Sequence, residues 1–207
     1  MKEIIMLHQG VSKKKAIQMA LQRLEEVNIS DPERLIHQYS FELSGGMRQR
    51  VMIAMAISCL PDLLIADEPT TALDVTIQIQ ILRLLRTLIR KIGKSILIIS
   101  HDLGVIAEIC HRVGVMYAGR IVEVGSVESI FESPMHPYTR GLIRAIPKLS
   151  EEVRRLPVIE GVIPNLIYPP TGCRFHPRCG LGKEECRKTP PPLRERQPGH
   201  WIACHDV

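Results

Sequence analysis

The sequence predicts an α/β fold in which short parallel strands alternate with helices. Two short, almost wholly apolar runs, Leu63–Ala66 and Ser95–Ser100, are separated by a long amphipathic segment. Runs of this kind are typical of parallel strands that helices cover on both faces. Polar side chains follow both runs, with Asp67 and Glu68 after the first and His101 closely after the second. Because parallel strands present their carboxyl ends at one edge of a sheet, we expect Glu68 and His101 to lie on the same rim, where α/β proteins bind ligands.

Residues 1–42 are expected to form a small helical subdomain. Ser12 is a suitable N-cap for one helix, and Asp31-Pro32 marks the start of another because proline is tolerated in the first helical turn. Apolar side chains recur here at helical spacing, namely Ile4, Ile5, Leu7, Ile17, Ala20, Leu21, Leu24 and Val27.

The next stretch, Leu43-Ser44-Gly45-Gly46, is a polar turn that opens onto a helix. Glycines at a helix N-terminus suit the close approach of an anion, because free N–H groups and the helix dipole both point there. This helix is apolar almost all round, which predicts burial. A longer helix is expected from about Val75 to Ile92, and Gly93 fits its C-cap.

Downstream of the second strand, the sequence predicts a helix, a hairpin around Ala118-Gly119 and two further short helices. In order, these elements cover Asp102–Cys110, Val113–Tyr117 with Arg120–Val124, Ser126–Phe131, and Tyr138–Ile146.

The composition changes after Ile146. Nine of the fifteen prolines lie at or beyond Pro157, and four of the six cysteines lie there too. An appendage so rich in loops has too few apolar residues for a core of its own, so we expect a metal or a partner surface to hold it. The sequence therefore divides into a helical subdomain at 1–42, a core at 43–146 and a C-terminal extension at 147–207.

The bulk properties bound the class of protein. The 207 residues carry a net charge of +5, with no apolar run long enough to span a bilayer and no evident secretory signal. A cytosolic protein with reduced cysteines is expected. The tail is rich in arginine and lysine, but few aromatic side chains are interleaved with them. We therefore interpret it as a solvated basic face near anionic lipid headgroups, with no nucleic acid bound.

Four motifs, in order and spacing, resemble those of ABC-transporter ATPase subunits. Leu43–Arg50 looks like the signature motif, Leu63–Thr70 like the Walker B strand, Thr71–Asp74 like the D-loop, and Ser100-His101-Asp102 like the switch histidine. The resemblance implies a P-loop NTPase-like ABC nucleotide-binding domain, with ATP and Mg²⁺ as cofactors.

The resemblance also implies roles for the rim residues. Asp67 would hold Mg²⁺ through water, Glu68 would orient or deprotonate the attacking water, and His101 would contact the γ-phosphate. From the residues alone, a solvated Asp-Glu pair and a capping or core histidine remain open.

The signature motif would serve the ATP of an opposing subunit. Ser44, Gly45 and Gly46 would touch its γ-phosphate, and Gln49 is counted with these nucleotide-binding residues. Asp74, with Ala72, would lie at the dimer interface. An ordinary helix cap is the alternative for both Ser44 and Asp74.

One motif of the family is missing, because no G-x-x-x-x-G-K-[ST] occurs in the 207 residues. The resemblance begins inside the family pattern, so we expect an N-terminally truncated chain that lacks about its first third. A truncated gene, a mis-called start and a split ATPase are all open. Such a chain is expected to be inactive alone and to expose strand edges and apolar sheet faces.

The tail resembles the C-terminal extension of di- and oligopeptide importer ATPases. The resemblance lies in Gly172–Cys179, Cys186 and Gly199–His205, and Met47 and Pro134–Thr139 also look like that branch. Some members of the branch carry a four-iron cluster, and four thiolates suit one.

The spacing C-x5-C-x6-C-x17-C lacks the paired knuckles of most zinc sites. Cys173, Cys179, Cys186 and Cys204 are the candidate ligands of a [4Fe-4S] cluster. Zinc bound by the cysteines or with His200 and His205, and unmetallated thiols, are the alternatives.

The function implied is that of an ATP-binding, ATP-hydrolysing subunit that energises di- or oligopeptide import. Its partners would be a second ABC ATPase subunit, identical or homologous, the transmembrane permease and, indirectly, a peptide-binding protein. It would lie peripherally on the cytoplasmic face of the membrane. A non-catalytic half that offers only its signature face, and a soluble ABC protein not tied to transport, are the alternatives.

Overall fold

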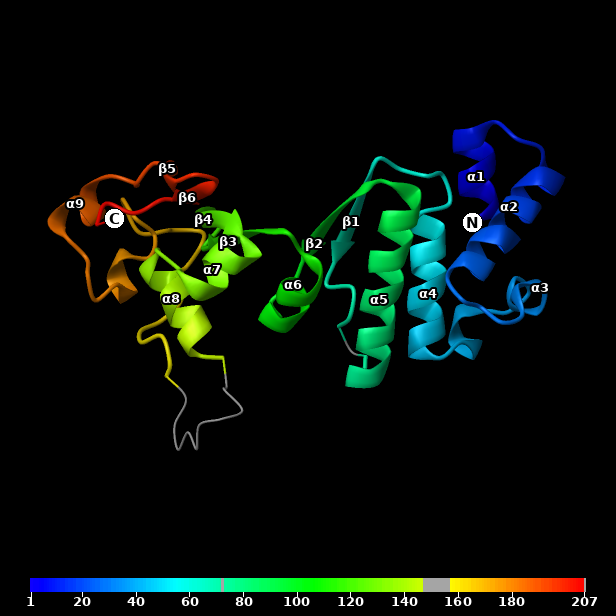
Figure 1. Ribbon diagram of the computed structural model, residues 1–207, viewed down its shortest axis with the longest axis horizontal. Helices are drawn as coiled ribbons and strands as arrows, with labels where there is room; N and C mark the ends of the chain where they lie inside the picture. Colours follow the sequence, from blue (N-terminus) through cyan, green and yellow to red (C-terminus); the bar gives the residue numbers. More distant parts are fainter. Residues whose placement is uncertain (72, 147–156, 207) are drawn as a thin grey trace. The chain divides into compact units, whose positions relative to one another are not determined.

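The computed structural model describes residues 1–71, 73–146 and 157–206, which fall into two compact units, Met1–Ile109 and Cys110–Val207. The first unit contains α1 (Lys2–Gln9), α2 (Lys13–Glu26), α3 (Pro32–Leu35), η1 (Ser40–Glu42), α4 (Gly45–Ala56), β1 (Leu63–Asp67), α5 (Val75–Ile92), β2 (Ser95–Ile99) and α6 (Leu103–Ile109) (Figure 1). The second contains β3 (Arg112–Tyr117), β4 (Arg120–Ser126), α7 (Val127–Glu132), α8 (Pro137–Arg144), η2 (His176–Arg178), α9 (Glu184–Lys188), β5 (Arg194–Gln197) and β6 (His200–Ile202).

The helices of the first unit begin and end where local chemistry predicts. Ser12 and Ser44 cap α2 and α4 by accepting hydrogen bonds from Lys15 and Met47. Gly93 ends α5 in the left-handed conformation. One face of α5 joins a core with α2, α4 and β1, made of Leu24, Val27, Ile53, Ala54, Ile57, Leu64, Ile81, Leu84, Leu85 and Leu88 among others.

Helix α4 is buried on one side only. Ile53 and Ala54 lie in the core, whereas the side chain of Met52 is 61% exposed. The prediction of burial all round was therefore wrong, because among the described residues α4 packs against α2 and α5 and leaves its remaining face uncovered.

Strands β1 and β2 form a parallel pair in the register Leu63↔Ser95 to Asp67↔Ile99. Leu64 is buried beneath α5, but the alternate side chains Ile65 and Leu97 remain 59% and 49% exposed. Coverage on both faces was thus a wrong prediction for the described residues. The expectation of an open apolar sheet face was correct.

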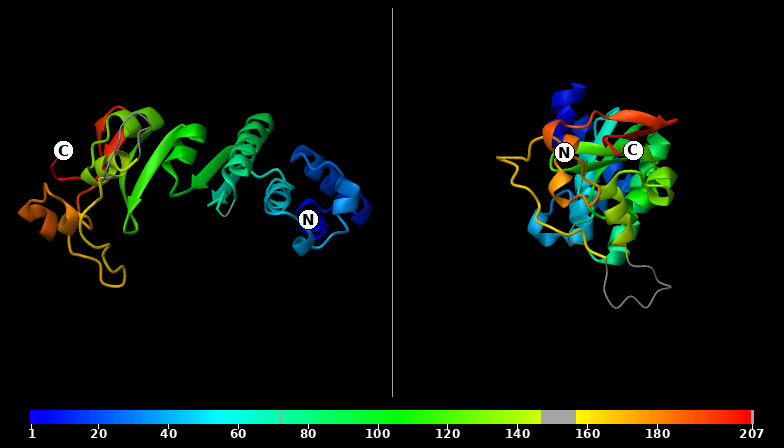
Figure 2. Two further views of the ribbon diagram at one scale, coloured as in Figure 1. Left: turned by 90° about the horizontal axis from the view of Figure 1, so that it is seen from below. Right: turned by 90° about the vertical axis from the view of Figure 1, so that its left-hand side faces the viewer.

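The second unit is built on a four-stranded antiparallel sheet in the order β3-β4-β6-β5. Strands β3 and β4 form the predicted hairpin, whose turn residues Ala118 and Gly119 both have positive φ. Strand β6, from the tail, pairs with β4 through Val124↔Trp201, and β5 forms one edge of the sheet. Two further views of the chain are given in Figure 2.

The tail therefore rests on the hairpin. Sheet pairing is reinforced by an aromatic cluster in which the rings of Tyr117, Tyr138 and Phe175 lie 4.7–5.4 Å apart. The expectation that a metal or a partner surface must hold this segment was wrong for the described residues, because the β3–β4 hairpin holds it by strand pairing. The compact units also group residues 110–146 with the tail, whereas the sequence grouped them with residues 43–109.

None of the helices within the described ranges is long and apolar enough to cross a lipid bilayer.

Candidate functional site

The carboxyl ends of β1 and β2 place Glu68 at the rim of the parallel pair. The Glu68 N–H continues the strand pairing by donating to the Ile99 carbonyl at 2.9 Å. Its φ of 47° is unusual for a non-glycine residue. Such backbone strain is concentrated at functional sites. The turn is supported by Thr71, whose hydroxyl donates to Glu68 Oε2 at 3.0 Å.

Glu68 and His101 meet at this rim, as the strand ends predict. Glu68 Oε1 lies 2.7 Å from His101 Nδ1. This hydrogen bond is the main reason why the pKa of His101 is raised above its usual 6.5 and the pKa of Glu68 is lowered below 4.5. The two shifts agree in describing an ionised carboxylate beside an imidazolium. Both side chains remain open to solvent, so a phosphate can reach them.

Asp102 and Gln78 link this rim to neighbouring helices. Asp102 Oδ1 accepts from the Gly104 and Val105 amides at the start of α6, while Asp102 Oδ2 accepts from Gln78 of α5 at 3.2 Å. Asp102, the residue after His101, is thereby tied to α5. Sequence reasoning gave Asp102 no role, although its place at a helix start signalled a cap.

Asp67 and Asp74 occupy different positions. Asp67 ends β1 with an exposed side chain, and one carboxylate suits Mg²⁺, which retains most of its water. Asp74 caps α5 by accepting from the Ile77 amide at 2.9 Å. Ala72 lies outside the described residues.

The signature stretch forms the first turn of α4. Ser44 Oγ accepts from the Met47 amide at 3.3 Å, so the helix-cap alternative does describe Ser44 in this structure. A Cβ on Gly46 would lie 3.0 Å from the Ile77 side chain, which explains the need for a small residue where α4 meets α5. The first N–H groups of a helix lack intrahelical acceptors and suit an anion. Gln49, one turn on, is partly buried in α4.

The four tail cysteines converge from separate segments. Cys173 N–H donates to the Cys186 carbonyl at 2.7 Å, and Cys204 follows directly after β6. Burial, then the charges of Cys186 and Cys204, raise the pKa of Cys173. The same causes raise the pKa of Cys179. Across the described residues, however, no three His, Cys, Asp or Glu side chains stand arranged as a metal site.

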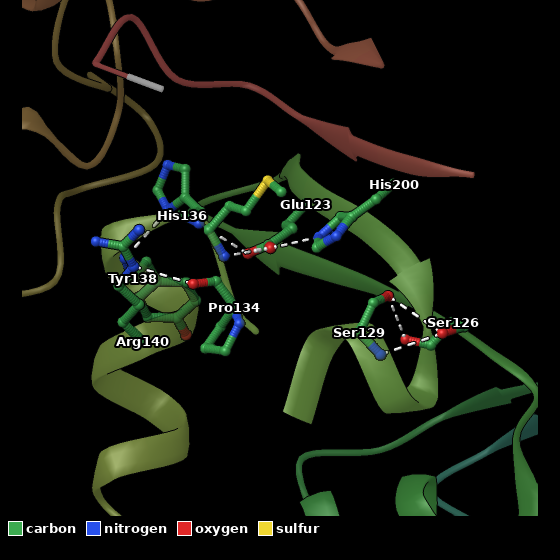
Figure 3. A network of polar contacts seen from close by, with 9 residues as sticks. Glu123, Ser126, Ser129, Pro134, His136, Tyr138, Arg140 and His200 are labelled. Carbon is green, nitrogen blue, oxygen red and sulfur yellow. Dashed lines mark hydrogen bonds and ion pairs between the residues drawn. The ribbon is translucent and has the colours of Figure 1, made fainter. Parts of the chain in front are cut away.

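The buried carboxylate of Glu123 was not anticipated. It accepts hydrogen bonds from the Met135 and His136 amides at 2.7 and 3.0 Å and lies 2.7 Å from His200 Nε2 (Figure 3). Its only signal in the sequence is an acid within an apolar strand. His200 Nε2 is thereby engaged by Glu123, and His205 Nε2 contacts the Thr189 carbonyl. Within the described residues, neither histidine forms a metal-binding group with the cysteines.

Comparison with known proteins identifies the family and the fold. Residues 2–71 match a family model described as ABC transporter. The structure also resembles cbiO1 from Clostridium perfringens, part of the ABC transporter complex cbiONQ, with a TM-score of 0.53 and 29% identity over 59% of this chain and 48% of that one. The fold is that of the ABC transporter ATP-binding class.

The C-terminal residues identify the branch. Residues 122–186 match the model described as oligopeptide/dipeptide transporter, C-terminal region. The chain belongs to the ATP-binding family of ABC transporters, in the branch that carries this region.

Curated relatives agree with this assignment. The chain is 54% identical to a probable peptide ABC transporter ATP-binding protein, y4tR, of Sinorhizobium fredii. It is 49% identical to the oligopeptide transport protein OppD of Salmonella typhimurium and 47% to the dipeptide transport protein DppD of Escherichia coli. These matches cover 98% of the chain but only 60–62% of each relative.

Proposed function

We propose that this chain is part of an ATP-hydrolysing subunit that energises di- or oligopeptide import. The observation that carries the proposal is the contact of Glu68 with His101 at the ends of two parallel strands in an ABC-type fold. The peptide substrate is supported by the C-terminal match and by the names of the relatives.

In the proposed mechanism, the rim residues act on a nucleotide bound at this edge of the sheet. Glu68, kept ionised by His101, accepts a hydrogen bond from the attacking water and orients it toward the γ-phosphate. His101 offers positive charge to the developing negative charge on the phosphate oxygens. Asp67 would hold Mg²⁺, which neutralises phosphate charge when bound.

The signature face acts on a second nucleotide. Ser44, Gly45 and Gly46 present the amino end of α4, so they would contact the γ-phosphate of ATP held by an opposing subunit, with Gln49 nearby. Asp74, at the start of α5, would adjoin that interface. A head-to-tail dimer is therefore proposed, with an identical or homologous second subunit.

The remaining partners follow from peptide import. The dimer would attach to a transmembrane permease at the cytoplasmic face of the membrane, and a peptide-binding protein would act indirectly. Nucleic acid has no part in this mechanism. A non-catalytic half that lends only its signature face is the second candidate.

The signature role can be tested by association with a full-length relative such as DppD of Escherichia coli. A non-hydrolysable ATP analogue should promote association, and Ser44→Arg should weaken it at least ~10-fold by placing bulk and charge at the phosphate. Ser12→Arg is the matched control, because Ser12 caps α2 by the same type of bond. The proposal would be contradicted if the affinity between the two chains did not depend on the nucleotide, or if Ser44→Arg left that affinity unchanged.

Catalysis by Glu68 separates the two candidates. In a complete transporter whose subunit contains this sequence, Glu68→Gln should lower ATP hydrolysis by about 10²–10⁴-fold, while Glu108→Gln on the exposed face of α6 should not. Unchanged hydrolysis in Glu68→Gln would favour the non-catalytic half.

We further propose that Cys173, Cys179, Cys186 and Cys204 hold an iron–sulfur cluster. The chemistry of the donor set supports this, because four thiolates suit such a cluster, and a bound cluster would cross-link the segments that carry them. Anaerobically purified protein should contain iron and sulfide and absorb visible light. Cys173→Ser should remove both properties, and Cys110→Ser should preserve them. Zinc alone, or no metal, would refute the cluster.

A further inference from the structure

The second unit contains a cavity of about 370 Å³ that no part of the proposed ATPase mechanism uses. It lies between the β3–β4 turn, the loop at residues 172–175 and the proline run at residues 190–192. Most of its wall is apolar, contributed by side chains such as Ile121, Val122, Phe175 and Leu193. Its volume falls within the range of small-molecule sites.

Two arginines supply the charge of this cavity. The Arg174 guanidinium is fixed, because Nη1 donates to the Ala118 carbonyl at the hairpin turn. Arg120 lies on the other side of that turn and makes no ion pair with any residue in the described ranges. Among the described residues that line the cavity, none is acidic. An apolar wall beside uncompensated guanidinium groups complements an anion that carries an apolar body.

A neighbouring cavity shows the contrast. It measures about 350 Å³, shares Pro190 and Pro192, and is lined by Arg194, Arg196 and His205 together with the acidic Glu185. Glu185 Oε1 lies 3.4 Å from His205 Nδ1, so an acidic group is already present in this second cavity. The second cavity is therefore mostly polar and contains an acidic side chain, whereas the first combines a mostly apolar wall with arginines and no acid.

We propose that the first cavity binds a small organic carboxylate with an apolar tail. The carboxylate of the ligand would pair with Arg120, and the fixed Arg174 would orient that carboxylate. The apolar tail of the ligand would lie against Ile121, Leu193 and the proline run at residues 190–192. Cys173 also lines this cavity, so an occupant would lie beside the cysteine-bearing segments. Such a site could report the presence of a small anionic ligand to the C-terminal region, independently of ATP.

The test is calorimetric titration of the whole chain with octanoate. Saturable binding is expected, with acetate binding at least tenfold more weakly because it lacks the tail. Likewise, 1-octanol should bind at least tenfold more weakly because it lacks the charge. Arg120→Gln should weaken octanoate binding about tenfold through loss of a charge-assisted hydrogen bond. Arg194→Gln, which alters the neighbouring cavity, is the matched control and should bind octanoate as the unaltered chain does.

A second variant locates the site without removing charge. Leu193→Trp should fill the cavity mouth and weaken octanoate binding. Because the Leu193 side chain is partly exposed, the variant should still fold. Melting curves for each variant verify this. The proposal is overturned if octanoate does not bind, if 1-octanol binds equally well, or if Arg120→Gln and Leu193→Trp bind as tightly as Arg194→Gln.

Discussion

Glu68 and His101 form an exposed ion pair whose protonation can be followed directly. His101 has a raised pKa and Glu68 a lowered one, so the charged pair exists from below pH 4.5 to above pH 6.5. Its contribution to folding is complete between the usual pKa values of the two groups, 4.5 and 6.5, and it is lost as pH rises through the raised pKa of His101 or falls through the lowered pKa of Glu68. Above that pH, His101 is neutral and Glu68 keeps its charge without a partner.

We predict that NMR titration of the His101 ring will give a pKa above 6.5, and that Glu68→Gln will lower it toward 6.5. Thr71→Val should have a smaller effect, because its hydroxyl contacts the other carboxylate oxygen. An unchanged His101 pKa in Glu68→Gln would show that the two side chains do not pair in solution.

His136 is a buried histidine of the opposite kind. Burial, as the largest effect, lowers its pKa to about 4 although Glu123 opposes this shift; Arg140 contributes to the lowering. The unfolded chain therefore binds the proton more readily between pH 4 and 6.5, so stability is lost as pH falls through that range. Neutral His136 Nδ1 accepts from the Tyr138 amide and so caps α8.

We predict a loss of roughly 3 kcal/mol of unfolding free energy between about pH 6.5 and pH 4 through this residue. Urea denaturation, followed by the fluorescence of the single tryptophan, Trp201 on β6, measures it. His136→Asn retains a capping side chain but does not titrate, so its stability should fall much less. Equal pH dependence in both proteins would exclude His136 as the cause.

At the scale of an element, the loop before Cys173 depends on one glycine. Gly172 has a φ of 68°, and a Cβ there would overlap the Cys186 carbonyl. That carbonyl accepts from the Cys173 amide at 2.7 Å, while Thr171 Oγ1 donates to the neighbouring Arg187 carbonyl at 3.0 Å. The glycine thus permits the close backbone approach that joins this loop to α9.

We predict that Gly172→Ala destabilises the chain by at least ~2 kcal/mol, through left-handed strain and backbone overlap. Gly180→Ala is the control, because no atom lies within 4 Å of the added Cβ and its φ is not positive. Equilibrium denaturation of both variants provides the measurement. Similar stabilities would mean that the loop can rearrange without cost.

At the scale of the whole molecule, the uncovered face of the β1–β2 pair is the surface that we expect to promote aggregation. Ile65 and Leu97 are register partners on β1 and β2, and both point away from the core with about half of their surface exposed. Adjacent exposed strands with apolar side chains favour association between copies.

We predict that Ile65→Thr combined with Leu97→Thr lowers self-association, measured by sedimentation velocity over a concentration series. The melting temperature should change little, since these side chains are not in the core. Val158→Thr, at an exposed position of the second unit, removes similar apolar character elsewhere and should leave self-association unchanged. If the double variant associates as the parent does, another surface is responsible.

Local sequence patterns predicted the helices and strands of the first unit well, because apolar runs and capping residues determine where these elements begin and end. Apolar runs predicted β1 and β2, and the strand ends predicted the contact between Glu68 and His101. What escaped prediction depends on distant residues. Met52 is exposed because nothing described packs on that face of α4. Glu123 gives no hint in the sequence of its partner His200, which lies 77 residues away.

That separation has a consequence for the order of folding. The β3–β4 hairpin closes over a two-residue turn and can form within about 1–10 μs. The Glu123–His200 contact, by contrast, must close a loop of 77 residues. The entropic cost of so long a closure places the docking of β6 late. Before β6 docks, Glu123 on the hairpin is still exposed to water. The hairpin would then act as the template on which the cysteine-bearing tail assembles last.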